Sequence, residues 1–138
     1  MRLLIFKELT VHKYIYIVIL FFISKCYAGI GLETTRIIYD ENKASASVIA
    51  FNDSKKVNYL IQSWVENEDG YIIDDFIITP PLQKINGMSK NSIDVVKVKP
   101  ITGKEEKLYW ANFKFIPPVD KNAESQLAIT VIHKIKLI

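Results

Sequence analysis

Short runs of alternating hydrophobic and polar residues follow one another from about residue 32 to the end of the chain. β-Branched and aromatic side chains recur every eight to twelve positions, and no run keeps the 3.6-residue period of an amphipathic helix. The pattern predicts an all-β chain with strands at residues 32–39, 44–51, 57–65, 72–78, 93–98, 107–116 and 126–137.

Turn-forming residues separate these runs, for example at Asn86-Gly87 and at Pro117-Pro118. About seven short strands in the 110 residues from 29 to 138 is the number expected of an immunoglobulin-like β-sandwich. The sequence of this stretch shows no internal repeat, low-complexity segment or linker. We therefore expect residues 29–138 to form one immunoglobulin-like domain.

The last predicted strand, 126–137, carries apolar residues on both faces. One face holds, at every second position, Leu127, Ile129, Val131, His133, Ile135 and Leu137. Such a strand either lies in the middle of a core or offers its edge to another chain.

Two tryptophans are candidates for the core. Residues 57–65 carry bulky side chains on both faces, as a central strand does, and Trp64 lies among them. We expect Trp64 to pack with Trp110 inside the sandwich, with no role in ligand binding.

Residues 1–28 have the three-part layout of a secretory signal peptide. Three basic residues precede an apolar stretch at 14–23, and Ala28 is the last residue before the expected cut. Ten apolar residues would span only about half of the ~20 that a membrane-crossing helix needs. Cleavage is therefore favoured over a membrane anchor, and no membrane attachment is expected after cleavage.

Removal of residues 1–28 changes the charge of the chain. The whole sequence has 18 Lys and Arg against 15 Asp and Glu, a formal net charge of +3, but residues 29–138 hold 14 of each. A neutral domain is not expected to bind nucleic acid, which requires a basic face. The single cysteine, Cys26, lies in the predicted signal peptide, so no disulfide is expected.

Catalytic and metal-binding side chains are scarce in residues 29–138. His133 is the one histidine there, without a flanking motif, and there is no cysteine. The adjacent carboxylates of Asp74-Asp75 and Glu105-Glu106 would point to opposite faces of a strand, so neither pair forms a catalytic dyad. We expect no enzymatic activity, no metal and no cofactor.

Two cations interrupt runs that are otherwise apolar. Arg36 lies in the first predicted strand, and Lys136 lies near the end of the last one. Basic residues in strands usually mark an edge or a solvated face, and that explanation is the simpler one from composition alone.

Six segments follow one another along residues 29–138: GIGLETTRIIYD, NYLIQSWVENEDG, FIITPPL, EKLYWAN, FKFIPP and a closing IKL. Together with the signal peptide, their order and spacing resemble the periplasmic chaperones of pilus and fimbria assembly, the PapD and FimC type. The resemblance covers the N-terminal domain of that family.

The resemblance implies a non-enzymatic chaperone of the periplasm that caps pilin or fimbrial subunits and works with an outer-membrane usher. Chaperones of this family lend their last strand to a subunit that lacks one, which is called donor-strand complementation. The corresponding donor residues here are Leu127, Ile129 and Val131. Arg36 and Lys136 correspond to the residues that hold the subunit's C-terminal carboxylate.

Members of the family continue past the IKL segment into a second immunoglobulin-like domain, whereas this sequence ends at Ile138. We therefore expect the second domain to be absent. A truncated gene product or a fragment, inactive in assembly, is the hypothesis that follows. Glu106 corresponds to a family residue that contacts the domain interface, and its partners would be missing.

The alternative interpretation is a self-contained secreted immunoglobulin-like module for binding or adhesion. Such a module would be a monomer with a protected last strand. A bared donor strand would instead favour self-association through its edge.

Overall fold

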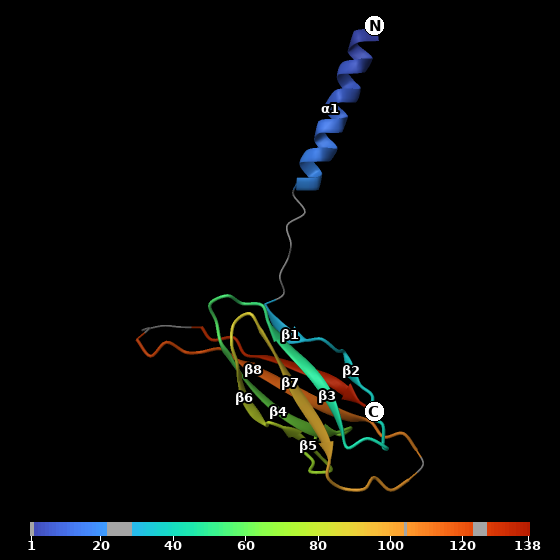
Figure 1. Cartoon of the computed structure of the whole chain (residues 1–138), viewed down its shortest axis with the longest axis vertical. Helices are drawn as coiled ribbons and strands as arrows, with labels where there is room; N and C mark the ends of the chain where they lie inside the picture. Colours follow the sequence, from blue (N-terminus) through green and yellow to red (C-terminus); the bar gives the residue numbers. More distant parts are fainter. Residues whose placement is uncertain (1, 22–28, 104, 123–126) are drawn as a thin grey trace.

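The computed structural model describes residues 2–21, 29–103, 105–122 and 127–138. In these residues one helix precedes nine strands (Figure 1). The elements are α1 (Arg2–Phe21), β1 (Ile30–Leu32), β2 (Arg36–Ile37), β3 (Ser45–Asn52), β4 (Tyr59–Asn67), β5 (Phe76–Thr79), β6 (Leu82–Ile85), β7 (Ser89–Lys97), β8 (Tyr109–Ile116) and β9 (Val131–Leu137).

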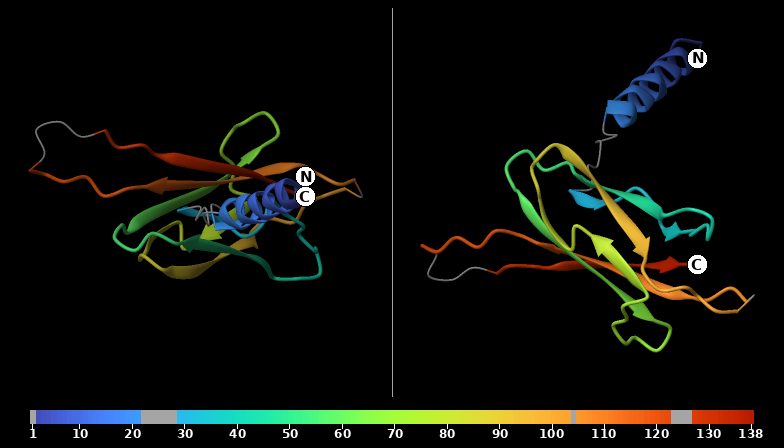
Figure 2. Two further views of the ribbon diagram at one scale, coloured as in Figure 1. Left: turned by 90° about the horizontal axis from the view of Figure 1, so that it is seen from above. Right: turned by 60° about the horizontal axis from the view of Figure 1, so that its bottom comes forward.

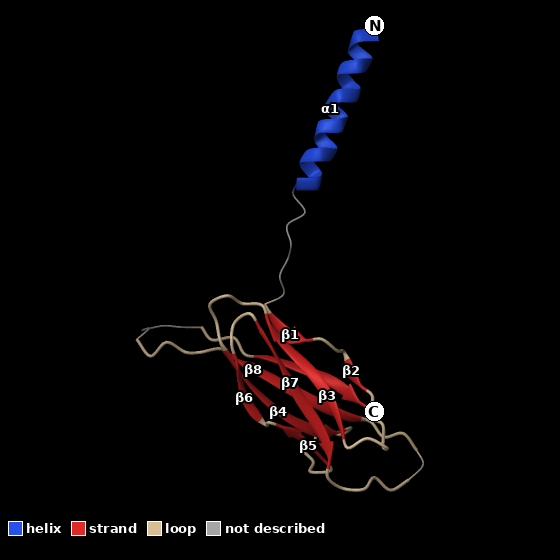
Figure 3. Ribbon diagram, in the orientation of Figure 1, coloured by secondary structure: helices blue, strands red, loops and turns tan. Residues whose placement is uncertain are grey.

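The strands form two sheets that pack face to face, as the alternating pattern predicts (Figure 3). One sheet has four strands in the order β1-β3-β7-β5, and the other has five in the order β2-β9-β8-β4-β6. Neighbouring strands are antiparallel except β2 and β9, which run parallel. The sandwich confirms the predicted fold class.

The core consists of every second residue of the central strands. β4 and β8 contribute the largest share from the five-stranded sheet, because their buried inward positions are apolar except for Ser63 on β4. β3 and β7 supply the opposing layer. The largest side chains with almost no exposed surface are Phe113, Phe115, Ile61, Ile85, Ile93, Leu137, Val48 and Val95.

The two tryptophans lie outside this core, which corrects the prediction. Ile61 and Val65 face inward on β4, so Trp64 between them faces outward. Trp110 faces outward on β8 for the same reason, because Ala111 is fully buried. Both tryptophans are half-buried on the outer face of the five-stranded sheet.

The predicted first strand, 32–39, is divided between the two sheets. β1 pairs with β3 in the four-stranded sheet, and β2 pairs with β9 in the other. Between them the hydroxyl of Thr34 donates a 2.7 Å hydrogen bond to the carbonyl oxygen of Arg36. A side chain that bonds its own backbone two residues on favours a turn, and here the chain crosses from one sheet to the other.

The predicted last strand, 126–137, begins only at Val131. Val131 pairs with Phe115, so in the same register Ile129 and Ala128 would lie opposite Pro117 and Pro118. Proline has no N–H to donate to a neighbouring strand, and the ladder stops there. The orange segment after β8 and the red segment before β9 extend away from the sheets (Figure 2).

α1 covers part of the predicted signal peptide and is drawn apart from the sandwich in Figure 1. A helix with the length and hydrophobicity of a membrane span is not found among the described residues. The predicted cleavage position at Ala28 lies outside the described residues, so the signal peptide stays a prediction.

The connection from β6 to β7 depends on a close backbone approach at Gly87. Its N–H donates to the side-chain oxygen of Asn58, and the next N–H, of Met88, donates to the carbonyl oxygen of Ser54. A Cβ atom added at Gly87 would collide with that same Ser54 oxygen, which is backbone and cannot move aside alone.

We expect Gly87→Ala to lower the free energy of unfolding by about 1–3 kcal/mol, as overpacking does. Gly29→Ala is the matched control, because a Cβ there meets nothing within 4 Å. Urea unfolding of both variants checks this. Equal stability of the two would show that the connection relaxes without cost.

Candidate functional site: an open strand edge beside two cations

The two edges of β9 are used very differently. One edge pairs with β8 along the whole of Val131–Leu137. The other pairs with β2 only at Lys136 and Leu137, opposite Arg36 and Ile37. Within the part of the chain that the structure describes, no strand lies beside Val131–Ile135 on that second edge, so its backbone groups are open to pairing.

The inward face of β9 changes from core to surface along the strand. Leu137 is 0 % exposed and Ile135 is 8 % exposed, whereas Val131 is 42 % exposed. In the segment before the strand, Ile129 is 68 % exposed and Leu127 is 86 % exposed. The three residues predicted as donors are therefore all exposed, Val131 at the start of β9 and the other two just before it, and together they are called the exposed apolar row.

His133 lies between the buried Ile135 and the exposed Val131 on the inward face of β9. Its ring packs edge to face on the buried ring of Phe115, with centroids 5.3 Å apart. This contact accounts for the one histidine of the sandwich as a packing residue at the rim of the core.

Arg36 and Lys136 are brought together by the parallel pairing of β2 with β9. Their Cα atoms are register partners, and both side chains are exposed on the outer face of the five-stranded sheet. None of the three salt bridges found among the described residues involves either of them. Two unpaired cations on neighbouring strands form a site suited to an anion such as a carboxylate.

A surface hollow of about 360 Å³ lies at this pair of cations. It opens on the outer face where β2, β8 and β9 meet. Its lining residues are Thr35, Arg36, Trp110, Lys134, Ile135, Lys136 and Ile138. The open edge of Val131–Ile135 leads along β9 toward this hollow, so a strand added there would reach the cations with one of its ends.

Glu66 organises the outer face next to the hollow, and sequence reasoning missed it. One of its carboxylate oxygens accepts a 2.8 Å hydrogen bond from the Lys134 ammonium, and the other accepts one of 2.8 Å from the Trp64 indole N–H. The Lys134 ammonium also lies 5.4 Å from the centre of the Trp110 ring. The hydrogen bond from Lys134, followed by that from Trp64, holds the pKa of Glu66 below its ordinary value.

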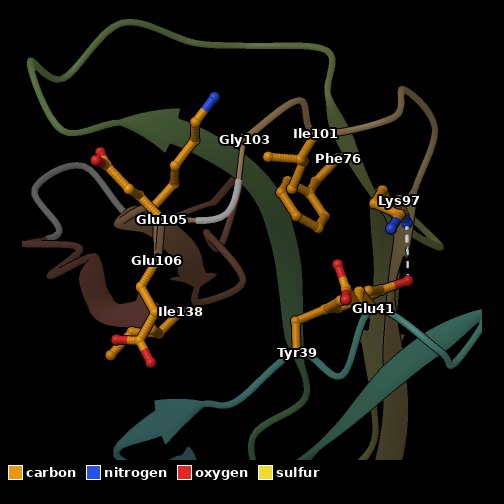
Figure 4. Close-up of a pocket in the computed structure, with 10 residues that line it drawn as sticks. Tyr39, Glu41, Phe76, Lys97, Ile101, Gly103, Glu105, Glu106 and Ile138 are labelled. Carbon is orange, nitrogen blue, oxygen red and sulfur yellow. Dashed lines mark hydrogen bonds between the residues drawn. The ribbon is translucent and has the colours of Figure 1, made fainter.

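A second hollow, of about 440 Å³, lies at the end of the sandwich where β2 and β9 finish (Figure 4). Tyr39 and Phe76 form its aromatic side, with ring centres 5.3 Å apart, and Ile101 lies beside Phe76. Glu106 and Ile138 line the opposite side. Over the described residues, no group of three or more His, Cys, Asp or Glu is placed to hold a metal ion.

The two-sheet sandwich with an open edge on its last strand defines a class of immunoglobulin-like domain. Comparison with known proteins identifies the family within that class. Residues 29–138 match the family described as pili and flagellar-assembly chaperone, PapD N-terminal domain. The chain belongs to this family, as the resemblance of its segments predicts.

Curated relatives carry the same assignment. The chaperone protein FocC of Escherichia coli is 36% identical over 124 residues, which cover 87% of this chain and 55% of FocC. The chaperone protein FimC of Escherichia coli K12 is 36% identical over 118 residues, 83% of this chain and 49% of FimC. The chain therefore spans about half the length of the curated relatives it matches.

Solved structures agree on the fold. The periplasmic chaperone SfaE superposes with a TM-score of 0.69 at 33% identity, over 79% of this chain and 56% of SfaE. The SafB chaperone of Salmonella enterica, solved in complex with the SafA pilin, reaches 0.70 at 22% identity, over 83% of this chain and 55% of the matched chain. The immunoglobulin-like prediction is confirmed.

The interaction between Glu66 and Lys134 predicts a pH-dependent coupling. A lowered pKa means that ionised Glu66 stabilises the fold at pH values above about 4.5, and that this contribution is lost as the pH falls through the lowered value. A double-mutant cycle of Glu66→Gln and Lys134→Met should give a coupling free energy of about 0.2–1 kcal/mol at neutral pH. The coupling should vanish in acid, and a pH-independent coupling would contradict the ionic origin.

Proposed function

We propose that this chain is a periplasmic chaperone of pilus assembly that caps pilin subunits by lending them the open edge of β9. The observation that carries the proposal is the edge along Val131–Ile135, which lies between an exposed apolar row and two unpaired cations. The names of FocC and FimC as chaperone proteins support this function, as does the SafB chaperone solved with a pilin. Non-enzymatic binding is sufficient for it.

The direction of the partner strand follows from the position of the cations. A carboxylate ends a peptide, and Arg36 with Lys136 lies at the C-terminal end of β9. A strand added along Val131–Ile135 must therefore run parallel to β9 for its C-terminus to arrive at these residues. β2 already occupies the edge beyond that point, so it would stop the added strand at Lys136.

Backbone pairing and the apolar row would contribute different things to binding. Hydrogen bonds along the open edge depend little on side chains, so they allow several related subunits to bind. Leu127, Ile129 and Val131 would fill pockets of the subunit and fix the register. Each could contribute up to about 1.5–3 kcal/mol if it became fully buried.

The cations would fix the end of the subunit strand. Hydrogen bonds from Arg and Lys to a carboxylate are short and directional, and both side chains here are free to make them. An edge that pairs through backbone alone could slip by two residues. A carboxylate held at Lys136 removes that freedom.

The proposed partners and cellular compartment of this protein are those expected for the family. We propose the periplasm as the compartment, reached through the predicted signal peptide, and an outer-membrane usher as the partner that receives the capped subunit. Self-association through the bared β9 edge is the competing fate of a chaperone without a subunit. The exposed row favours this proposal over a self-contained adhesion module, whose last strand would be protected.

Changing Leu127, Ile129 and Val131 together to Ser should abolish protection of a co-expressed pilin from the same genome, because the partner's pockets would stay empty. Ile132→Ser is the matched control, since Ile132 lies on the same segment of chain, is 52 % exposed and faces the other side. Pilin recovered from the periplasm measures the effect. Equal recovery with the triple variant would contradict strand donation.

Replacing Arg36 or Lys136 by Gln should weaken binding of a pilin about tenfold or more, the usual effect of losing a hydrogen bond to a charged group. Lys114→Gln, on the outer face of β8 and away from the hollow, should leave binding unchanged. Titration of each purified variant with a purified pilin measures the dissociation constant and tests this. An equal loss in all three variants would point to general charge attraction instead of a defined carboxylate site.

A further inference from the structure

The hollow beside Arg36 and Lys136 has an aromatic side as well as a cationic side. Trp110 is the register partner of Lys136 across β8 and β9, so its side chain lies on the same outer face and lines the hollow. Arg36 flanks Lys136 on the opposite side, through β2. A ligand bound here would therefore meet two positive charges on one side and an indole ring on the other.

Lys134 borders the same hollow, but its charge is directed away from Arg36. Its ammonium is bonded to Glu66 on β4, and β8 lies between β4 and β9. The lysine side chain must therefore cross β8, where it passes over the ring of Trp110. The part of Lys134 left to border the hollow is its methylene stem, which extends the apolar side of the hollow.

Several contacts hold this arrangement in place. The side chain of Glu66 is only 15 % exposed, whereas that of Lys134 is 43 % exposed. Trp64 fixes the second oxygen of Glu66, and Asn112 lies buried beneath the group at 2 % exposure. A carboxylate held this firmly can keep a flexible lysine in one position.

We propose that the hollow selects the last residue of the partner strand, preferring a large apolar side chain next to the free carboxylate, and that Glu66 maintains this preference by holding Lys134 against Trp110. The inference rests on the proposed function, which brings a strand's C-terminal carboxylate to Arg36 and Lys136. Trp110 is the specificity-determining residue, and Glu66 is a positioning residue that acts through Lys134.

The physical basis is the balance between apolar contact and charge in one small site. With Lys134 held at Glu66, the terminal side chain contacts the indole and the lysine methylenes, and burial of apolar surface favours a large group. With Lys134 released, its ammonium would reach toward the hollow. The site would then attract any carboxylate more strongly but would offer less apolar surface to the side chain beside it.

Binding of short strand-forming peptides to the whole chain tests the proposal. The probes are fluorescein-labelled Val-Thr-Val-Thr-Val-Phe and Val-Thr-Val-Thr-Val-Ala, in which the last side chain lies on the face opposite the Val residues, each prepared as the free acid and as the C-terminal amide. Fluorescence anisotropy gives the four affinities. We expect both acids to bind more tightly than their amides, and the Phe acid to bind about tenfold more tightly than the Ala acid.

Trp110→Thr should reduce the Phe-to-Ala ratio to near one and should leave the acid-to-amide ratio unchanged. Leu60→Thr is the control, because Leu60 is a 43 % exposed apolar residue of the same sheet that does not line the hollow. Circular dichroism and urea unfolding show that each variant is folded. A Phe-to-Ala ratio that survives Trp110→Thr would overturn the proposal.

Glu66→Gln separates positioning from general destabilisation. The change should weaken binding of the Phe acid and should leave binding of the Ala acid equal or tighter, because a positive charge is released near the carboxylate. An equal loss of affinity for the Phe acid and the Ala acid would mean that Glu66 only stabilises the sheet. Glu33→Gln, which breaks the ion pair with Lys90 elsewhere on the surface, should change neither affinity.

The outcomes distinguish this inference from the function on which it rests. Amides that bind as well as acids, or acids that do not bind at all, would contradict the carboxylate site of Arg36 and Lys136. Acids that bind better than amides but without preference between Phe and Ala would leave that site in place and would overturn the selectivity assigned to Trp110 and Glu66.

Discussion

The asymmetric pairing of β9 is the constraint on which the rest of the structure depends. β8 pairs with β9 along its full length, so β9 has a fixed position in the sheet. On the other edge of β9, β2 pairs with only the last two residues. That short cover has two consequences. It brings Arg36 beside Lys136, and it leaves the edge along Val131–Ile135 without a neighbour among the described strands.

An open edge next to exposed apolar residues is normally a risk, because it can pair with any other strand. Here positive side chains alternate with apolar ones along β9, at Lys134 and Lys136. Backbone pairing alone would let a second copy of β9 add to this edge, which is the self-association proposed above. A strand that ends in a carboxylate meets attraction at the same place, so the cations discriminate between partners as well as binding one.

The alternation of apolar residues was enough to predict the two-sheet sandwich, because each sheet buries one face and the period of a strand is two. It did not say which of two bulky faces is buried, and Trp64 was therefore placed in the core. The inward face of β4 contains Ser63 between two apolar residues, so the sequence pattern does not show that this face is the buried one. The turn at Thr34 was also missed, since one hydroxyl decides that the first strand divides.

The pairing of Arg36 with Lys136 could not be derived from the residues alone, because it depends on the register between the two ends of the domain. Only the resemblance to a family suggested it. The contacts of Glu66 are even harder to predict from the sequence, because they join residues of β4 and β9 across the intervening strand β8. Its one local sign is the spacing of Trp64 and Glu66, which places both on one face.

Packing of the core determines where the anion site at Arg36 and Lys136 lies. Leu137 and Ile135 are buried, so the two lysines that alternate with them must point outward. A slip of β9 by one residue would place Lys136 in the core and Leu137 in water, and the cost of burying that charge forbids it. Val131 lies on the same face as these two core residues, at the exposed start of the strand, and Ile129 and Leu127 precede it outside the sheet. Core packing therefore sets both the side of the strand that offers cations and the side that offers apolar groups.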